Sequence, residues 1–285
     1  MAIPEHFATE FSSNWMQRVQ QTKARLEPYV DVETFMGEKK RYDRLASQTA
    51  HERTERLGPT VINSFTDDSR WAYRRQFELA NLLDEADAKN MAPLALPDSA
   101  LLASHAAAYN RSFDDYVIEK ALGAVMTGEN GTTSTAFSAT YQIAHGGTGL
   151  TLAKLVTMNE ILNGADLEDD AIRVLVVGQQ QISNLLNETK IQSSDYNTIR
   201  ALVAGQVDSF MGFKFVKNTR LTKVSTTRTC VCWVKGAIKA YKGAMNHKPS
   251  VRNDLSDATQ LRSTWDFGAV RVYDEGVIQV DCTET

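Results

Sequence analysis

The sequence predicts an α+β fold, and three patterns along the chain support this prediction. Residues 98–127 carry apolar side chains at about four-residue intervals, which indicates one long amphipathic helix. Residues 29–82 alternate apolar and polar side chains at both ends of a charged middle, which indicates two strands joined as an extended hairpin. From residue 150 onwards, helical and strand patterns follow one another. We therefore expect a long helix and a projecting hairpin combined with a mixed α/β region.

The composition places the chain among globular proteins and argues against two classes of function. Of its 285 residues, 42% are hydrophobic and 23% are charged, and the net charge is −4. A dedicated nucleic-acid-binding protein is usually basic, so this charge argues against one. Because no run of about 20 apolar residues occurs, we expect no membrane span. The first residues include Glu5 and Glu10 instead of a signal segment, so we expect synthesis in the cytoplasm.

The cysteines suggest core thiols and not a disulfide. Cys230 and Cys232 are two positions apart, so on a strand they point to the same face and have poor disulfide geometry. Cys282 stands alone near the C-terminus. We expect reduced, half-buried thiols.

Residues 5–26 have the pattern of an amphipathic N-terminal helix that ends before Pro28. Its apolar stripe consists of Phe7, Phe11, Trp15 and Val19. Its late cations, which the helix dipole favours, are Arg18, Lys23 and Arg25. Such a stripe has to pack on something. It packs either on its own domain or, as an arm, on a neighbouring molecule.

The middle of the predicted hairpin, residues 37–58, is nearly devoid of large apolar side chains. Its basic residues are Lys39, Lys40, Arg41, Arg44, Arg53 and Arg56, and its acidic residues are Glu38, Asp43, Glu52 and Glu55. An isolated hairpin is marginal in water, and loops of this length tend to be functional. We therefore expect the hairpin to lie on another protein surface, with a flexible solvated loop as the alternative.

The long helix is expected to begin at a cap formed by Asp98 or Ser99 and to end at Gly128, a length of about 40 Å. His105 lies on its apolar stripe, and we interpret it as a packed helix residue and not as a ligand. Further helices are expected at 151–163, 179–189 and 195–205, and strands at 172–177, 213–217, 228–234 and 265–282.

One Gly-rich segment invites a catalytic interpretation, namely His145-Gly146-Gly147-Thr148-Gly149. Gly-rich backbone is able to cradle an oxyanion or a phosphate. The chain lacks a nucleophile elbow and a phosphate-binding loop, however, so a hinge is the favoured interpretation. No cluster of His or Cys has the spacing of metal ligands. We expect no catalytic residue, no metal and no cofactor.

A series of short motifs runs along nearly the whole chain. The motifs are Ile3-Pro4-Glu5-His6-Phe7, Arg70-Trp71-Ala72-Tyr73, Ala80–Asp87, Asp114-Asp115, Gly128-x-x-Gly131, Ser134–Phe137, Gly205–Leu221 and Asp266–Val272. In this order they resemble the major capsid proteins of tailed double-stranded DNA phages. The resemblance implies the Hong Kong phage type of capsid fold. Its parts would be an N-terminal arm (1–30), an extended loop (31–82), a peripheral domain with a spine helix (83–148), an axial domain (149–249) and a C-terminal part of the peripheral domain (250–285).

The resemblance also implies a set of partners. The chain would self-assemble as hexamers and pentamers into an icosahedral shell around double-stranded DNA, held without sequence specificity and without a membrane. The arm stripe and the six basic hairpin residues would lie at subunit interfaces, and Arg18, Lys23 and Arg25 would face the DNA. The spine-type helix is expected to begin near residue 98, which leaves no room before it for a domain-sized scaffolding segment. A separate scaffolding protein and a portal protein are therefore expected, and a decoration protein is left open.

Two alternatives remain at this point. The first is an encapsulin-like nanocompartment shell, which encloses protein cargo, and the second is a cytoplasmic enzyme that uses residues 145–149. Some relatives cross-link a loop lysine to an asparagine of a neighbour. Lys39 or Lys40 and Asn253 match that pair by region only, and we identify no matching catalytic carboxylate. We therefore expect non-covalent shells.

Overall fold

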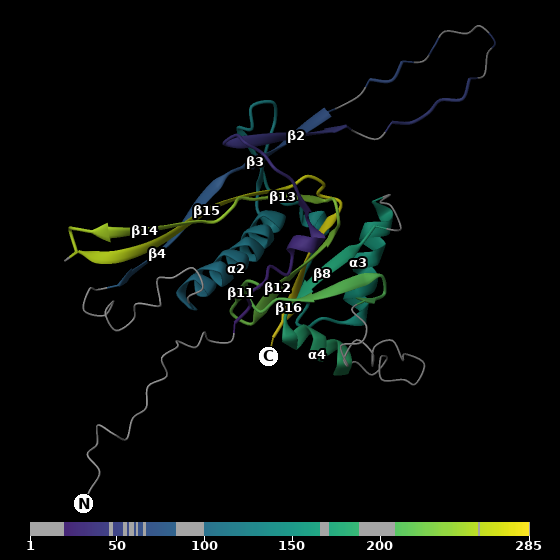
Figure 1. The fold of residues 1–285 in the computed structure, drawn as a ribbon. Helices are drawn as coiled ribbons and strands as arrows, with labels where there is room; N and C mark the ends of the chain where they lie inside the picture. Colours follow the sequence, from purple (N-terminus) through teal and green to yellow (C-terminus); the bar gives the residue numbers. More distant parts are fainter. Residues whose placement is uncertain are drawn as a thin grey trace, which may run out of the picture. The chain divides into compact units, whose positions relative to one another are not determined.

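The structure divides into two compact units, each assembled from several chain segments (Figure 1). It is a computed structural model that describes residues 20–45, 48–53, 56, 60, 62–64, 67–83, 100–165, 171–187, 209–255 and 257–284. The first unit comprises Met1–Ala24, Gln76–Phe113 and Gly243–Asp266, and the second comprises Arg25–Arg75, Asp114–Lys242 and Phe267–Thr285.

The first unit contains a ribbon of strands and the first part of the long helix. The helix is α2 (Ala100–Leu122), and the strands are β4 (Arg75–Leu83), β14 (Asn246–Arg252) and the first half of β15 (Ala258–Arg271). β14 and β4 both pair with β15, and the β14 pairing is antiparallel. Tyr109 of α2 meets the ring of Trp265 edge-on at 5.8 Å. Pro249 lacks an N–H, which an edge strand such as β14 tolerates.

The largest sheet of the second unit follows the order β7-β16-β12-β8-β10-β9, and β11 adds to β12. The bounds of its strands are β7 (Gln142–Ile143), β8 (Arg173–Val177), β9 (Ser209–Phe210), β10 (Phe213–Lys217), β11 (Lys223–Val224), β12 (Thr227–Val234) and β16 (Val277–Thr283). All five residues of β8 are buried, as expected for a strand that pairs with a parallel neighbour, β10. Two helices accompany this sheet, α3 (Leu152–Gly164) and α4 (Gln179–Asn187) (Figure 1).

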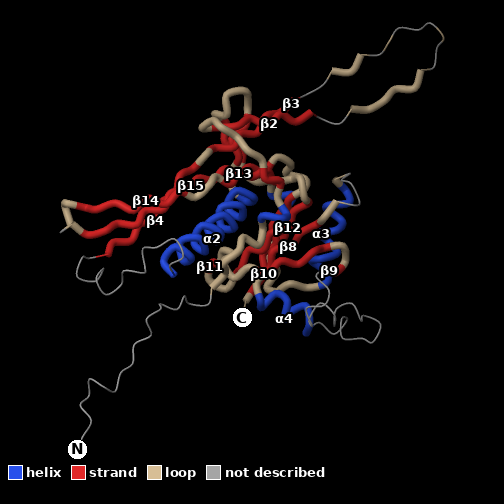
Figure 2. The backbone as a smooth tube through the Cα atoms, in the orientation of Figure 1, coloured by secondary structure: helices blue, strands red, loops and turns tan. Residues whose placement is uncertain are grey.

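Two smaller groups of strands complete the second unit (Figure 2). In the first, β1 (Asp31–Val32) runs parallel to β13 (Ile238–Lys242), and β13 pairs with the second half of β15. The second follows the order β2-β3-β5-β6, with β2 (Lys39–Leu45), β3 (Asp67–Tyr73), β5 (Val125–Thr127) and β6 (Thr133–Thr135). Short 3₁₀ turns occur at η2 (Glu27–Tyr29) and η4 (Ala139–Tyr141).

Most of the predicted elements are confirmed. The helices expected at 151–163 and 179–189 are α3 and α4, and the strands expected at 213–217 and 228–234 are β10 and β12. The extended hairpin is also confirmed, since β2 and β3 pair in an antiparallel register from Lys39↔Tyr73 to Leu45↔Asp67. Strands β13 and β14 were not predicted.

Other predictions need correction or lie outside the described residues. The first strand of the hairpin, β2, lies within residues 37–58, which were predicted to be the charged middle between the two strands. This segment forms a strand because its charged side chains have ion-pair partners, as Lys40 has in Glu33 and Arg44 has in Asp68. The long helix ends at Leu122 and not at Gly128, since Gly123 is followed by strand β5. Residues 20–26 are not helical, while the rest of the predicted arm helix and the helix at 195–205 lie outside the described residues. All three cysteines are free, as predicted, but fully buried and not half-buried, because their sheet lies in the core.

Glu284 ties the end of β16 to its neighbours in the second unit. Its carboxylate accepts hydrogen bonds from the Arg228 guanidinium, from Lys223 Nζ at 2.7 Å and from Gln181 Nε2 at 3.0 Å. The hydrogen bond from Arg228 is the main cause that lowers the pKa of Glu284 to about 2, and burial opposes it. A lowered carboxyl pKa adds stability above the unfolded pKa, and that stability is lost as the pH falls through the folded pKa.

We therefore predict that Glu284→Gln makes subunit stability less sensitive to acid. Between pH 6 and pH 3 the wild-type free energy of unfolding should fall by about 2 kcal/mol more than that of the variant, measured by urea denaturation. Glu160→Gln, on an exposed position of α3, is the matched control and should behave as wild type. Identical acid dependence of wild type and Glu284→Gln would contradict the prediction.

Candidate functional site: the anchored hairpin

The β2–β3 hairpin stands on a small apolar cluster of the second unit. The cluster comprises Ala72, Val125, Val270 and Val272, each at most 4% exposed, with Tyr42 packed against it. These side chains come from β3, β5, the end of β15 and β2. The base of the hairpin is therefore part of the folded core, and strands β2 and β3 extend from it (Figure 2).

A buried pair of arginines shares one carboxylate at this base. Arg70 Nη2 donates to Asp274 Oδ2 at 2.7 Å, and Arg271 Nε donates to Asp274 Oδ1 at 2.5 Å. The side chains of Arg70 and Arg271 are 4% and 0% exposed, and that of Asp274 is 17% exposed. Burial raises the pKa of Asp274, but the hydrogen bond and charge of Arg271 and the charge of Arg70 outweigh it, so the pKa lies below its ordinary value. Asp274 therefore remains ionised and joins β3 to β15.

Arg271 also joins this site to the end of α2. Its Nη1 donates to the carbonyl oxygens of Ala121 at 2.6 Å and Gly123 at 2.9 Å. The last carbonyls of a helix lack partners within the helix and carry partial negative charge, so a buried cation suits them. Its guanidinium also lies 4.5 Å from the centre of the Phe137 ring. Burial lowers the pKa of Arg271, and Asp274 opposes that effect.

A third arginine connects the other hairpin strand to the same base. Arg44 of β2 donates to Asp68 Oδ2 at 2.7 Å and to the carbonyl oxygen of Val272 at 3.0 Å. Arg70 approaches the same Asp68 oxygen at 3.4 Å. Both strands of the hairpin are therefore held to the end of β15 by charged side chains.

The six basic residues predicted for subunit contacts separate into two groups. Four lie on β2 and contact side chains of the same subunit: Lys39 Nζ lies 4.6 Å from the Trp71 ring centre, Lys40 donates to Glu33 at 2.6 Å, Arg41 bonds Asp43, and Arg44 bonds Asp68. The other two, Arg53 and Arg56, lie in the loop with exposed side chains, and Arg53 also interacts within the subunit. Sequence reasoning identified the charged segment but missed Arg70, Arg271 and Asp274. One feature of the sequence could have indicated the buried Arg271. It is a charged residue directly between two apolar residues of a predicted strand, Val270 and Val272.

The predicted arm is described only from residue 20 onwards. Phe7, Phe11, Trp15, Val19 and Arg18 lie outside the described residues, and Lys23 is exposed.

Asp114 holds the beginning of the second unit. Its buried carboxylate accepts hydrogen bonds from the backbone N–H groups of Arg25 at 3.0 Å and Leu26 at 3.1 Å, and Arg25 Nη1 donates to the carbonyl oxygen of Lys217 at 2.6 Å. The chain therefore departs from the unit at a defined point.

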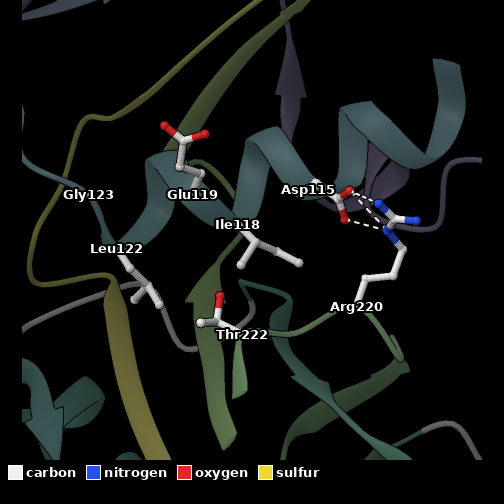
Figure 3. Close-up of a pocket in the computed structure, with 7 residues that line it drawn as sticks. All are labelled: Asp115, Ile118, Glu119, Leu122, Gly123, Arg220 and Thr222. Atoms are coloured by element: carbon white, nitrogen blue, oxygen red, sulfur yellow. Dashed lines mark hydrogen bonds and ion pairs between the residues drawn. The ribbon is translucent and has the colours of Figure 1, made fainter. Parts of the chain in front are cut away.

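A shallow groove of about 370 Å³ lies beside the last turns of α2 (Figure 3). It is lined by Asp115, Ile118, Glu119, Leu122, Gly123, Arg220 and Thr222. One end is closed by Arg220, whose Nε donates to the two Asp115 carboxylate oxygens at 2.8 and 2.9 Å. The groove pairs a polar rim with an apolar floor, and nothing in its lining suggests chemistry on a substrate.

The Gly-rich segment surrounds a cation and not an anion. The buried Lys154 Nζ shares its three N–H protons among four backbone carbonyl oxygens, those of His145 at 2.9 Å, Thr148 at 3.1 Å, Gly149 at 2.9 Å and Asp281 at 2.9 Å. Burial lowers the pKa of Lys154. An oxyanion site needs N–H groups that converge on one point, whereas here carbonyl oxygens converge. The segment therefore acts as a lysine-centred turn that fixes α3 to β16.

The described part of the chain contains no group of three or more His, Cys, Asp or Glu side chains placed to hold a metal ion. Among the same residues, no helix is both long and apolar enough to cross a membrane.

Comparison with solved structures shows which class of protein has this fold. A chain of Mycobacterium phage Che8 matches with a TM-score of 0.73 and 15% identity, covering 98% of each chain. The capsid of Myoviridae phage XM1 matches with a TM-score of 0.66 and 15% identity over 100% of this chain and 99% of the other. The head of Helicobacter pylori bacteriophage KHP40 matches with a TM-score of 0.71 and 9% identity over 96% and 95%. The fold is therefore the Hong Kong phage type of capsid fold.

The sequence comparison identifies the family. The model of the phage capsid protein family matches residues 3–284, so the chain belongs to that family. Among curated proteins, no sequence matches. The chain is a major capsid protein that self-assembles into the shell of a phage head, as the sequence motifs predicted.

The first prediction from this site concerns Asp274. Asp274→Asn should leave Arg271 buried without a counter-charge and Arg70 with only Asp68, and breaking such a buried pair costs about 3–5 kcal/mol. We expect faster hydrogen exchange in residues 39–45 and 67–73 of the free subunit, together with a lower free energy of unfolding. Asp254→Asn, which removes an exposed partner of Arg252, is the control and should change little. Equal exchange in the two variants would show that the arginine cluster does not hold the hairpin.

The second prediction concerns Lys154. Lys154→Met should leave several backbone carbonyls without a charged donor and lower the free energy of unfolding by about 3–5 kcal/mol in urea denaturation. Lys235→Met, at an exposed turn, should change it by less than about 0.5 kcal/mol. A Lys154→Met subunit as stable as wild type would reopen the catalytic interpretation of residues 145–149.

Proposed function

We propose that the shell is icosahedral, is built from hexamers and pentamers of this chain, and encloses double-stranded DNA. We further propose that the loop at residues 48–64 of each subunit lies on an adjacent subunit. The observation that supports this is the contrast between the two ends of the hairpin. Its base is fixed by Asp274 and a buried arginine cluster, while Ile62 in its loop is 88% exposed and Arg53 is exposed as well.

The fixed base matters because it gives the hairpin a defined direction. A loop on a mobile base would lose conformational entropy on every contact with a neighbour, whereas a pre-organised one loses less. Each exposed ion pair that Arg53 or Arg56 makes with a neighbour's carboxylate contributes only about 0–1 kcal/mol. Repetition of that contact around a closed shell multiplies the small contribution.

We also propose the division of the family fold for this chain, with an arm at 1–30, an extended loop at 31–82, a peripheral domain at 83–148 and 250–285, and an axial domain at 149–249. The long α2 suits the role of the spine helix, and the sheet around β8, β10 and β12 suits the axial domain. The arm residues Phe7, Phe11, Trp15 and Val19 then pack on neighbouring subunits.

The remaining partners are proposals from the family. They are a separate scaffolding protein, a portal protein and, in some particles, a decoration protein, with assembly in the bacterial cytoplasm. The protein acts as a structural component and not as an enzyme, which agrees with the carbonyl-lined Gly-rich segment. An encapsulin-like compartment is the second candidate, and nuclease-protected DNA in purified particles distinguishes the two.

Contacts to the DNA should be few and directed at phosphate. Arg18, Lys23 and Arg25 are the proposed DNA-facing residues. A net charge of −4 makes strong binding by the free subunit unexpected, and a shell does not need it. Phosphate contacts carry no sequence information and weaken steeply as salt rises.

The loop proposal predicts a specific failure of assembly. Replacing residues 48–64 with a short Gly/Ser turn keeps β2 and β3, so we expect a folded, soluble subunit that yields few closed shells in electron micrographs. The double variant Arg53→Gln with Arg56→Gln should raise the subunit concentration needed for assembly, because it removes the proposed pairs.

Two results would contradict the loop proposal. One is a normal yield of shells from the loop-replacement variant. The other is an equal effect of the matched acidic variant, Glu52→Gln with Glu55→Gln, which removes two charges of opposite sign from the same loop.

A further inference from the structure

Two histidines of the first unit share one buried hydroxyl. His105 Nδ1 on α2 lies 2.6 Å from Ser263 Oγ on β15, and His247 Nδ1 on β14 lies 2.7 Å from the same oxygen. His105 Nε2 lies 2.7 Å from Asn81 Oδ1 on β4. The chain Asn81–His105–Ser263–His247 therefore connects each strand of this unit to the helix.

The positions of the protons in this chain follow from its partners. Asn81 Oδ1 only accepts, so His105 carries its proton on Nε2. A neutral His105 then accepts on Nδ1, and Ser263 must donate its single hydroxyl proton to it. The Ser263 oxygen is left to accept from Nδ1–H of His247. All three hydrogen bonds between these four side chains therefore form when His105 is neutral.

A second proton on His105 breaks this arrangement. With an N–H on both ring nitrogens, His105 donates to Ser263, which already accepts from His247. The hydroxyl proton of Ser263 then has to turn to Nδ1 of His247, which accepts it only after His247 has given up the proton on that atom. The positive charge on His105 stays buried, since Ser263 is 0% exposed and His105 is 1% exposed. His247 differs, because it is exposed and its contact with Ser263 through Nδ1 leaves its Nε2 outside the hydrogen-bonded chain.

We propose that the Asn81–His105–Ser263–His247 chain is an acid-sensitive latch, which holds β14, β15 and β4 on α2 and opens when His105 is protonated. The proton comes from solvent and adds to Nδ1 of His105. The Ser263 hydroxyl then no longer donates to that atom, and the buried positive charge on His105 weakens the connection between the helix and the strands. This property belongs to the subunit and does not depend on the proposed shell contacts.

The titratable groups on the elements packed against His105 do not stabilise its protonated form. From β14 the titratable group that faces it is His247, whose ring centre is 6.5 Å away. On β15 and β4, Arg262 and Glu78 pair with each other, and alternation places Arg262 on the face opposite Ser263. On α2 the titratable group one turn away is Tyr109, which donates its hydroxyl proton to Gly243.

The direction of the pH effect follows from these neighbours. Burial lowers the pKa of His105 and the charge of His247 lowers it further, so the unfolded or opened state takes up the proton first. The latch is therefore complete above about pH 6.5, and its stability is lost as the pH falls below that value.

Hydrogen exchange of the full-length free subunit between pH 7.5 and pH 5 tests the latch. After correction for intrinsic rates, protection of β14 should fall by up to about tenfold per pH unit, the limit for uptake of one proton. In His105→Gln the protection should stay flat. In His247→Gln, the matched control, the fall should remain, because His105 still titrates.

Nuclear magnetic resonance provides an independent measurement. Neutral His105 should show the Nε2–H tautomer, and Ser263→Ala should raise the pKa of His105 because it removes the hydroxyl that needs the unprotonated nitrogen. Flat protection of β14 in the wild type, the same fall in His105→Gln, an Nδ1–H tautomer of His105, or an unchanged His105 pKa in Ser263→Ala would each overturn the proposal.

Discussion

The bidentate use of Asp274 by Arg70 and Arg271 is the interaction on which the candidate assembly site depends. It lies where β3, the end of β15 and the end of α2 meet, so one carboxylate connects the hairpin to the core. Two buried guanidinium groups would be costly without it, since an uncompensated buried charge is strongly destabilising. The geometry of the hairpin base therefore follows from electrostatic compensation as much as from its small apolar cluster.

The charged residues of the hairpin differ in whether they lie on a paired strand, where carboxylates of the same subunit neutralise them, or in the loop. In β2, alternate side chains face the fold, and there Lys40 pairs with Glu33 while Arg44 pairs with Asp68. These cations contact carboxylates of their own subunit, and their proposed role at subunit interfaces stays a prediction. Arg53 and Arg56 lie outside the paired strands, and their side chains are exposed. A uniform stretch of charge in the sequence thus contains residues of a paired strand and residues of an exposed loop.

Buried polar groups elsewhere in the subunit also have hydrogen-bond partners from distant segments, because an unpartnered polar group is costly in the interior. Lys154 satisfies four backbone carbonyls, and the His105–Ser263–His247 chain satisfies its members in one protonation state. Each arrangement joins elements that are distant in sequence, and each becomes unfavourable when one proton or one charge is changed. Within each unit, these buried polar groups therefore connect helices and strands that are far apart in the sequence.

The sequence by itself determined the class of fold, most helices and strands, and the family. Periodicity reports which face of an element is buried, so α3, α4, β10 and β12 were predictable, and ordered motifs were enough for the capsid resemblance. Only the tertiary structure decided that Lys39–Leu45 is a strand, that Arg271 is buried, and that the Gly-rich segment binds a lysine. The physical reason is that a charged side chain is stable in the interior only when a partner from a distant segment reaches it, and local periodicity carries no information about that partner.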